Sequence, residues 1–518
     1  MDFATYDIKE MFIPSEVLCR LDAEFASKNQ VLPLAVEAAA AGPRLVVAFS
    51  NAALLRQIPL LQETVKGPVR LVNYDGAVLS EAIERHYGSM EPLAPIIKQI
   101  EIVGRDMDAD AIAPISEAES SVVSELVNAI LMAALEARAS DIHIKPTKQT
   151  TVVLFREDGE IYDYTSKFNI SRNEHANVIR RVQMICRPQM DIGKSQVPLD
   201  GSFQFVAGER SVDCRVATLP TVNGLKLNIR LFDLNEKLRD LGDLGYPDAD
   251  VARLKKLLHR PSGMMLVSAP TGQGKSTTIH AAMGLFNPLK SIQILIEDPV
   301  EERLPNVDQV QIREVREEEL SLTPEKALRA CMRQDPDILG VGEIRDPQTA
   351  KTAVMMSQTG HLMFSTVHAR DSISALARVF ELGVPRGDFL REMVCLISQR
   401  LVRTICPDCG EKAEIPAELS EYLTPEELAL VKAGTLKKGK GCRCCNHRGY
   451  RGRIAVPEYI VFDNEVRDYL AESRGIQETI AFLRENKGYV PMWEKGLALV
   501  AEGRTTIEEV IARIAPDR

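Results

Sequence analysis

The chain has 518 residues, of which 45% are hydrophobic and 26% charged, so it is long enough for several folded domains and too apolar to be a disordered chain. Its 63 Lys and Arg residues against 73 Asp and Glu residues give a net charge of −10, which argues against non-specific nucleic-acid binding by the whole surface but allows a local basic patch. Because the sequence contains no apolar run of about 18 residues and no signal-peptide core, we expect a cytoplasmic protein.

Residues 1–115 form the first expected domain, a small α/β module. Apolar segments such as Arg44–Phe49 alternate with helical patterns, the last of which ends near Tyr87. The module carries no catalytic motif. The acidic, serine-containing stretch from Asp106 to Glu119 is typical of a linker between this module and the next domain.

Residues 116–235 show an α+β pattern, which predicts a second domain. The expected elements are a helix through Arg138, a strand at Asp141–Ile144, a hairpin turning at Asp158 and Gly159, a helix from His175 to Cys186 and further strands to Phe232. A flexible hinge is expected near Asp233–Gly242, before the next domain begins.

The strongest local signal lies between the apolar strand Met264–Val267 and the helical pattern Thr277–Ala282. The intervening sequence, Ala269-Pro-Thr-Gly-Gln-Gly-Lys-Ser276, predicts a phosphate-binding loop, with Ala269 in place of the usual first glycine. Glycines let backbone N–H groups turn toward a phosphate, and the start of the helix adds partial positive charge. Lys275 is expected to contact the β- and γ-phosphates, and Ser276 to bind Mg²⁺. The predicted nucleotide-binding residues are Thr271, Gly272, Gln273, Gly274, Lys275, Ser276 and Thr277.

Residues 243–400 alternate short apolar strands with helices, as in a mainly parallel sheet. Two of these strands, Ile292–Ile296 and Ile338–Val341, end near the acidic residues Glu297 and Glu343. Carboxylates at the carboxyl ends of parallel strands face the ligand crevice, where phosphoryl transfer needs a group that orients water. For either residue taken alone, a solvated loop acid is the alternative interpretation.

His368 closes a further predicted strand, Leu362–Ser365. A histidine at a strand end can sense a γ-phosphate by hydrogen bonding or by charge. A core histidine with satisfied hydrogen bonds is the alternative, and it is the preferred interpretation for this residue alone.

Five of the ten cysteines lie between Cys406 and Cys445, which in a cytosolic chain favours metal binding over disulfides. Cys406 with Cys409 and Cys442 with Cys445 form two pairs, whose four thiolates could surround Zn²⁺ in a structural site. The 32 residues between the pairs, 410–441, exceed the usual spacing of about 15 to 20. Cys444 is a spare thiol that could replace Cys445, and reduced cysteines without metal are the alternative.

These motifs together resemble the secretion ATPases of type II secretion and type IV pilus assembly, the GspE/PulE/PilB family, over most of residues 120–510. The matching segments, in family order, are Ser140–Ile144, Thr218–Thr221, the phosphate loop, Glu297–Glu301, Leu328–Asp337 with Gly342–Asp346, and Thr359–His361 through His368. The resemblance implies an α/β fold composed of a PAS-like α+β domain at 116–235, a RecA-like P-loop NTPase domain at 243–400, a tetracysteine zinc module at 401–458 and a C-terminal helical region at 459–518.

The resemblance also implies roles for individual residues. It places Glu297 in the aspartate box, Glu343 in the Walker B motif, and His361 and His368 in the histidine box. It matches Arg215 and Arg230, on predicted strands of the second domain, to arginines that reach the nucleotide. Without the resemblance, an exposed strand arginine in an ion pair is the preferred interpretation of both. The expected catalytic residues are Glu297, Glu343, Arg215, Arg230 and His368.

In function, the resemblance implies a cytoplasmic homo-hexamer that hydrolyses ATP with Mg²⁺, contains Zn²⁺ and drives pilin or pseudopilin polymerisation through an inner-membrane platform protein. The N-terminal module is expected to bind a membrane-anchored assembly protein, and it lacks the Arg-Leu-Gly-x-x-Leu repeat associated with cyclic-di-GMP-binding versions. A pilus retraction motor is disfavoured because such motors generally lack the zinc insert and the extra N-terminal domain. A nucleic-acid translocase is disfavoured by the net acidity and the 5% aromatic content.

Overall fold

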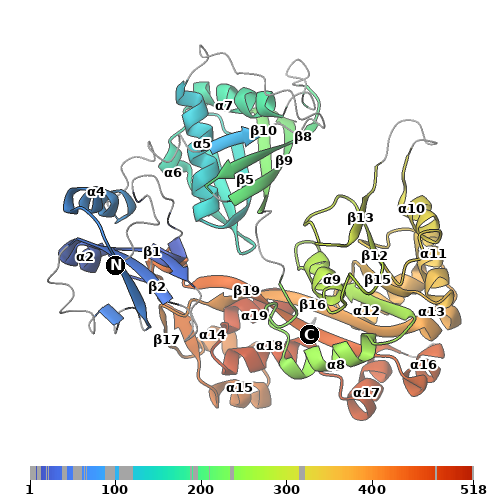
Figure 1. Ribbon diagram of the computed structural model, residues 1–518. Coiled ribbons are helices and arrows are strands. Elements are labelled where there is room, and N and C mark those ends of the chain that lie inside the picture. Colours follow the sequence, from blue (N-terminus) through green and yellow to red (C-terminus); the bar gives the residue numbers. More distant parts are fainter. Residues whose placement is uncertain are drawn as a thin grey trace. The chain divides into compact units, whose positions relative to one another are not determined.

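The computed structural model divides the chain into two compact units, Met1–Asn235 and Glu236–Arg518 (Figure 1). It describes residues 8, 13, 15–18, 20, 21, 23–37, 44–50, 61, 62, 65, 67–87, 100–103, 121–186, 190, 196–208, 210–233, 239–313, 321–472 and 475–515. Each cluster of buried hydrophobic side chains among these residues lies within one unit, so each unit folds around cores of its own.

The first unit begins with a three-stranded sheet in the order β1-β2-β3. Strand β2 pairs antiparallel with β1 and parallel with β3. The elements are α1 (Ser15–Leu18), α2 (Ala23–Asn29), β1 (Val31–Glu37), β2 (Arg44–Phe49), β3 (Val69–Asn73) and α4 (Gly76–Tyr87). Leu32, Val46 and Leu79 are fully buried in their shared core. The predicted strand at Arg44–Phe49 and the helix ending at Tyr87 are confirmed.

The second sheet of this unit has seven strands in the order β4-β8-β9-β10-β5-β6-β7, and every neighbouring pair is antiparallel. Its elements are β4 (Ile100–Val103), α5 (Ser121–Glu136), β5 (Ala139–Pro146), β6 (Thr151–Glu157), β7 (Glu160–Asp163), α6 (Thr165–Phe168), α7 (Arg172–Ile185), β8 (Leu199–Ala207), β9 (Arg210–Thr221) and β10 (Gly224–Asp233). Strand β4 pairs with β8 although it precedes residue 116, where we expected the second domain to begin. The predicted linker, Asp106 to Glu119, and residues 234–238 of the predicted hinge lie outside the described residues.

The predicted hairpin of this domain is confirmed, and one helix boundary differs from its prediction. Asp158 and Gly159 form the turn with φ angles of 47° and 90°, the left-handed conformations that this type of tight turn requires. Helix α5 ends at Glu136 rather than continuing through Arg138. Because Arg138 has a φ of 54°, it lies in the left-handed region and ends the helix.

Helix α7 begins at Arg172 rather than at the predicted His175 because a capping box precedes it. The Ser171 hydroxyl accepts a hydrogen bond from the N–H of Glu174, and the Glu174 carboxylate accepts one from the N–H of Ser171. Helices α5 and α7 share one hydrophobic core with the inward-facing residues of the seven-stranded sheet. The predicted α+β pattern of helices and strands is therefore present in this domain.

The second unit contains a seven-stranded sheet in the order β13-β12-β14-β15-β11-β16-β19. Its first six strands are parallel, and β19 is antiparallel to β16, so the predicted mainly parallel sheet is confirmed. The elements up to the sixth strand are α8 (Asp248–Leu258), β11 (Gly263–Ser268), α9 (Lys275–Met283), β12 (Gln293–Glu297), β13 (Asp308–Gln311), α10 (Pro324–Cys331), β14 (Ile338–Val341), α11 (Pro347–Gln358), β15 (Leu362–Val367), α12 (Ser372–Glu381), α13 (Arg386–Glu392) and β16 (Met393–Ile405).

Helices cover both faces of this sheet (Figure 1). One face packs with α8 and α9, and the other with α10 to α13 and α16. All six residues of β11 are buried, as are the residues of β14 and β15. Burial on both faces explains why these strands are continuously apolar in sequence rather than alternating.

The remaining elements of the second unit are short strands and helices around the last strand. They are β17 (Gly410–Lys412), α14 (Ala417–Ser420), α15 (Pro425–Lys432), β18 (Lys437–Gly439), η4 (Arg443–Cys445), β19 (Tyr450–Val461), α16 (Asn464–Ala471), α17 (Ile476–Lys487), α18 (Met492–Ala501) and α19 (Ile507–Ile514). Helices α15, α18 and α19 share a core around Leu497 and Val510. In the parts of the chain that the structure describes, no helix has both the length and the apolar character needed to cross a membrane.

Candidate active site

The predicted phosphate loop joins β11 to α9 at the carboxyl end of the parallel strands. Gly272 and Gly274 have φ angles of 74° and 76°, which glycine adopts without steric cost. Gly274 is also the residue that precedes the first turn of α9, and no side chain of the described residues caps that turn. The first N–H groups of α9 are therefore available to an anion, as a phosphate site requires.

Gln399, a buried residue of β16, holds the phosphate loop in place through hydrogen bonds. Its side-chain Nε2 donates to the carbonyl oxygen of Gln273 at 2.7 Å, and its Oε1 accepts from the Thr278 hydroxyl at 2.9 Å and the Tyr246 hydroxyl at 2.6 Å. The N–H of Leu401 donates to Oε1 of Gln273 at 2.7 Å. Sequence analysis missed Gln399, whose only signal is a polar side chain inside an apolar strand.

Lys275 folds back onto its own loop. Its Nζ donates to the carbonyl oxygens of Ala269 at 3.0 Å and Pro270 at 3.3 Å. Burial lowers the pKa of Lys275, and the negative charges of Glu343 and Glu301 act in the opposite direction. The ammonium group is therefore held by two weak carbonyl acceptors, which phosphate oxygens can replace.

Glu343 and His368 lie next to Lys275, at the ends of neighbouring strands. His368 Nε2 is 2.9 Å from Glu343 Oε1, and His368 Nδ1 is 3.4 Å from Lys275 Nζ. The other carboxylate oxygen of Glu343 accepts from Arg345 at 2.9 Å. The structure thus brings three of the predicted site residues into one chain of contacts and adds Arg345, which the sequence analysis did not single out.

Glu297 is placed differently from Glu343. It ends β12 and is buried, with Oε1 lying 3.0 Å from His280 Nε2 and Oε2 accepting from Gln309 Nε2 at 2.8 Å. Both of its oxygens therefore have partners within the protein. The exposed Glu301, four residues later, is the carboxylate of this segment whose charge acts on Lys275.

The second histidine of the predicted histidine box lies apart from this cluster. His361 precedes β15 whereas His368 follows it, so the two are at opposite ends of that strand. The Nδ1 of His361 lies 3.0 Å from the carbonyl oxygen of Met356 and 3.1 Å from the Thr359 hydroxyl. These contacts fix the end of α11 and the start of β15.

Arg215 and Arg230 lie directly opposite each other on β9 and β10, in the first unit. Arg230 Nε donates to Asp141 Oδ1 at 3.1 Å. The guanidinium carbon of Arg215 lies 4.5 Å from the centre of the Phe232 ring. The two arginines therefore share one part of the sheet, and their approach to a nucleotide stays a prediction.

Four cysteines of the second unit form a compact cluster. The sulfur of Cys442 lies 3.8 Å from that of Cys406 and 3.7 Å from that of Cys445, and the sulfur of Cys409 lies 3.8 Å from that of Cys445. All four sulfurs lie within 4.8 Å of one another. A tetrahedral zinc site with Zn–S bonds of about 2.3 Å has S–S edges of about 3.8 Å, so these residues fit a tetrahedral metal ion.

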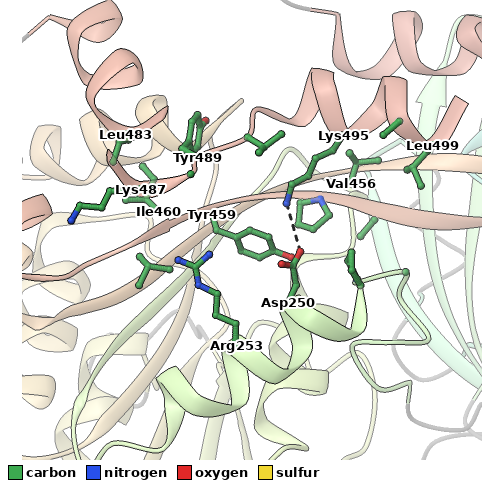
Figure 2. Close-up of a pocket in the computed structure, with 18 of the residues that line it drawn as sticks. Asp250, Arg253, Val456, Tyr459, Ile460, Leu483, Lys487, Tyr489, Lys495 and Leu499 are labelled. Carbon is green, nitrogen blue, oxygen red and sulfur yellow. Dashed lines mark ion pairs between the residues drawn. The ribbon is translucent and has the colours of Figure 1, made fainter. Parts of the chain in front are cut away.

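A separate cavity of about 360 Å³ lies between α8, β19, α17 and α18. Figure 2 shows Asp250 and Lys495 pointing toward each other among the residues that line the cavity, with Tyr459 beside them. Lys495 Nζ is 3.6 Å from Asp250 Oδ2 and 4.2 Å from the centre of the Tyr459 ring. These contacts join α8 to α18 across β19, on elements other than the phosphate loop.

Comparison with known proteins gives matches over both parts of the chain. Residues 116–512 match the family described as Type II/IV secretion system protein, and residues 2–93 match the MshEN domain. The type IV pilus assembly ATPase PilB of Myxococcus xanthus is 32% identical over 99% of this chain and 89% of its own length. The type II secretion system protein E of Pseudomonas aeruginosa is 32% identical over 98% of both chains.

Solved structures show the same fold. The pilus retraction motor PilT with bound ADP has a TM-score of 0.51 and 24% identity, covering 77% of this chain and 98% of its own. The ATPase DotB of Yersinia pseudotuberculosis has a TM-score of 0.55 and 18% identity, covering 79% of this chain and 97% of its own. At these identities the likeness concerns the fold alone, and it confirms the predicted mixed α/β, RecA-like ATPase fold.

Proposed function

Because the chain belongs to the type II/IV secretion system protein family and is an ATPase of that family, we propose that it powers pilin or pseudopilin polymerisation in type IV pilus assembly or type II secretion. The observation that carries the proposal is the contact chain Lys275–His368–Glu343 beside the phosphate loop. It supports the proposal because a cation, an imidazole ring and a carboxylate lie together beside the loop, as a γ-phosphate site requires. The reaction is the hydrolysis of ATP to ADP and phosphate.

In this proposal each group of the site has one task. Lys275 exchanges its two loop carbonyl acceptors for β- and γ-phosphate oxygens, and the N–H groups of Thr271 to Thr277 surround the β-phosphate. Ser276 would hold Mg²⁺, which supplies further charge neutralisation when bound. Glu343 and the exposed Glu301, whose charges act on Lys275, would orient the attacking water, while the contacts of buried Glu297 favour a supporting task for that residue.

We further propose that the working form is a homo-hexamer in which a PAS-like second domain closes over the RecA-like domain of the same chain. Closure would bring Arg215 and Arg230 to the γ-phosphate, where a planar guanidinium suits the charge that develops on its oxygens. Mixing Arg215→Ala subunits with Lys275→Ala subunits tests this geometry. An arginine supplied within the chain rebuilds no complete site, whereas substantial recovery of ATPase activity contradicts closure within one chain.

For the cysteine cluster we propose a structural Zn²⁺ bound by Cys406, Cys409, Cys442 and Cys445. The sulfur spacing supports it, and four protein ligands leave no open position for chemistry. The cluster would join the segment after β16 to the segment before β19 and so stabilise the intervening helices. Its contribution is to folding rather than to hydrolysis.

The proposed partners are an inner-membrane platform protein and a membrane-anchored assembly protein that binds the N-terminal module, so that the enzyme works at the inner membrane from the cytoplasmic side. The match of residues 2–93 to a defined domain supports a distinct task for that module.

The test of the proposed function is to delete the gene in its host and complement it with wild type or Lys275→Ala. Loss of pili or of secreted protein that only wild type restores is expected. Excess pili after deletion would instead indicate a retraction motor, and salt-dependent stimulation of the ATPase by DNA a nucleic-acid translocase.

A further inference from the structure

We propose that His280 is a positioning residue for ATP hydrolysis, which holds Glu297 and Glu302 together and so fixes the intervening Glu301 beside the phosphate loop. The proposal rests on the proposed site, in which Lys275 binds the phosphates and Glu301 helps to orient the attacking water. The group of four residues His280, Glu297, Glu302 and Gln309 is called the His280 cluster below.

The position of the His280 imidazole is the first observation that supports the proposal. His280 lies on α9, the helix that begins at Lys275, and its side chain is only 4% exposed. Its Nε2 lies 3.0 Å from Glu297 Oε1 at the end of β12, and its Nδ1 lies 3.4 Å from Glu302 Oε2. One imidazole therefore links the phosphate-loop helix to both ends of the segment Glu297–Glu302.

Gln309 of β13 reinforces the same segment from the other side. Its Nε2 donates to Glu297 Oε2 at 2.8 Å and to the carbonyl oxygen of Glu302 at 2.7 Å, and its Oε1 accepts from the N–H of Leu304 at 2.8 Å. The two ends of the segment are thus held by side chains from two different elements. Glu301, directly before Glu302, therefore lies in a segment that is held at both ends.

The two ring nitrogens of His280 both face carboxylates, an arrangement that needs both nitrogens to be donors and hence a protonated ring. Burial alone would lower the pKa of His280, but the hydrogen bonds and charges of Glu297 and Glu302 outweigh it and raise the pKa to about 9. Among the described residues, the charged groups that face the ring are Glu297 from β12 and Glu302 from the following segment, while Gln309 from β13 is neutral. The protonated His280 ring, which donates to both carboxylates, is present at neutral pH and loses its proton as the pH rises through about 9.

Net stability does not account for this cluster. A buried ion pair contributes little to folding because desolvation offsets the attraction of the charges, and apolar residues of similar volume often replace such pairs without loss. Placing a reacting carboxylate is a better explanation, since an error of about 1 Å in such a position can cost about 100-fold in rate. We assign that position to Glu301, because it lies inside the held segment, is exposed, and has a negative charge that acts on Lys275.

The test compares His280→Gln and Glu302→Gln with His259→Ala, a matched control on an exposed histidine of α8's carboxyl end. In the full-length protein, we expect both cluster variants to lower kcat by about 10-fold to 100-fold while KM and ADP affinity change by less than about 2-fold. The control should match wild type. Glu302 is the more exposed partner, so its variant carries the test if His280→Gln does not fold.

A pH profile supplies a readout that a merely structural residue would not move. The ratio of wild-type kcat to His280→Gln kcat should fall toward one between about pH 7 and pH 10, because wild-type His280 loses its proton over that range. Taking the ratio cancels the titration of Lys275, which both proteins share. A ratio that stays constant, or cluster variants that lower the melting temperature while kcat stays at the wild-type value, would overturn the proposal.

Lys275→Ala, measured in the same assays, separates this proposal from the proposed site. Hydrolysis that persists in Lys275→Ala contradicts the site itself. If Lys275→Ala is inactive and the His280 cluster variants turn over at the wild-type rate, the site stands and only the positioning task of His280 is wrong.

Discussion

The phosphate loop and the cysteine cluster are both short motifs of the second unit, but their side chains are held in opposite ways. At the phosphate loop, Lys275 rests on two carbonyl oxygens at 3.0 and 3.3 Å, and its neighbour His368 is 42% exposed. In the cysteine cluster, Cys406 and Cys445 are buried and the sulfurs already have the spacing of a closed tetrahedron. The phosphate loop keeps contacts that a nucleotide can replace, whereas four cysteines around a metal ion would leave no open coordination position for a further ligand. Substitutions should therefore separate activity from stability.

The largest expected effect is that of Lys275→Ala on turnover. Removing the principal cation at the β- and γ-phosphates should lower ATP hydrolysis at least about 1000-fold and weaken ATP binding. Because the Lys275 amine contacts two carbonyl oxygens of its own loop and one exposed histidine, the melting temperature should change by less than about 3 °C. Phosphate release and thermal unfolding of the same preparation check both parts. Undiminished phosphate release would contradict the site.

The next largest effects on turnover are expected for substitutions of three carboxylates, Glu343, Glu301 and Glu297. Glu343→Gln and Glu301→Gln should retain nucleotide binding and slow hydrolysis by about 100-fold to 1000-fold, since the negative charge of each carboxylate acts on Lys275. Glu297→Gln should slow it less and lower the melting temperature, because it leaves buried His280 with a weakened partner. Glu325→Gln, at a surface ion pair with Arg329, is the matched control. If Glu297→Gln alone abolishes turnover without affecting stability, Glu297 rather than Glu301 acts on the water.

The phosphate loop was predictable because its chemistry depends on a short run of residues. Gly272, Gly274 and Lys275 lie within four positions, and the strand before them and the helix after them are visible as apolar and helical patterns. The same holds for the parallel strands, whose continuous apolar runs reflect burial on both faces. Local sequence therefore predicted the mainly parallel sheet of this unit and the loop between β11 and α9, while the roles of the site residues stay predictions.

What sequence could not predict depends on partners that are distant in the chain. Gln399 supports the loop through Gln273, 126 positions away, and no pattern near either residue indicates the pairing. The choice between Glu297 and Glu301 is similar, because both are acidic residues that follow one strand. In the structure, buried Glu297 contacts His280 and Gln309 from other elements, whereas Glu301 is exposed.

Loss of the metal should lower stability first and activity second, the reverse of what we expect at the phosphate loop. Chelation, or Cys442→Ser, should lower the melting temperature of the second unit by about 10 °C and reduce activity only as the unit unfolds, because the cluster holds two distant segments together. Zinc analysis of protein purified without chelator, followed by thermal unfolding with and without chelator, is the measurement. Less than about half a zinc ion per chain, with cysteines that react freely with a thiol reagent, would contradict the zinc site.

The smallest expected effect is that of Cys444→Ser, which tests the choice of the fourth ligand in the cysteine cluster. The sequence left two candidates for the fourth ligand, and the structure places Cys445 within the set of four while Cys444 lies outside it. The N–H groups of Cys442 and Gly449 both donate to the sulfur of Cys445 at 3.2 Å, contacts that stabilise a thiolate and so suit a metal ligand. Cys444→Ser should therefore retain about one zinc per chain and shift the melting temperature by less than about 2 °C, whereas Cys445→Ser should lose zinc and unfold as Cys442→Ser does. If instead the two variants exchange these outcomes, Cys444 is the ligand and the local backbone must rotate by one residue when the metal binds.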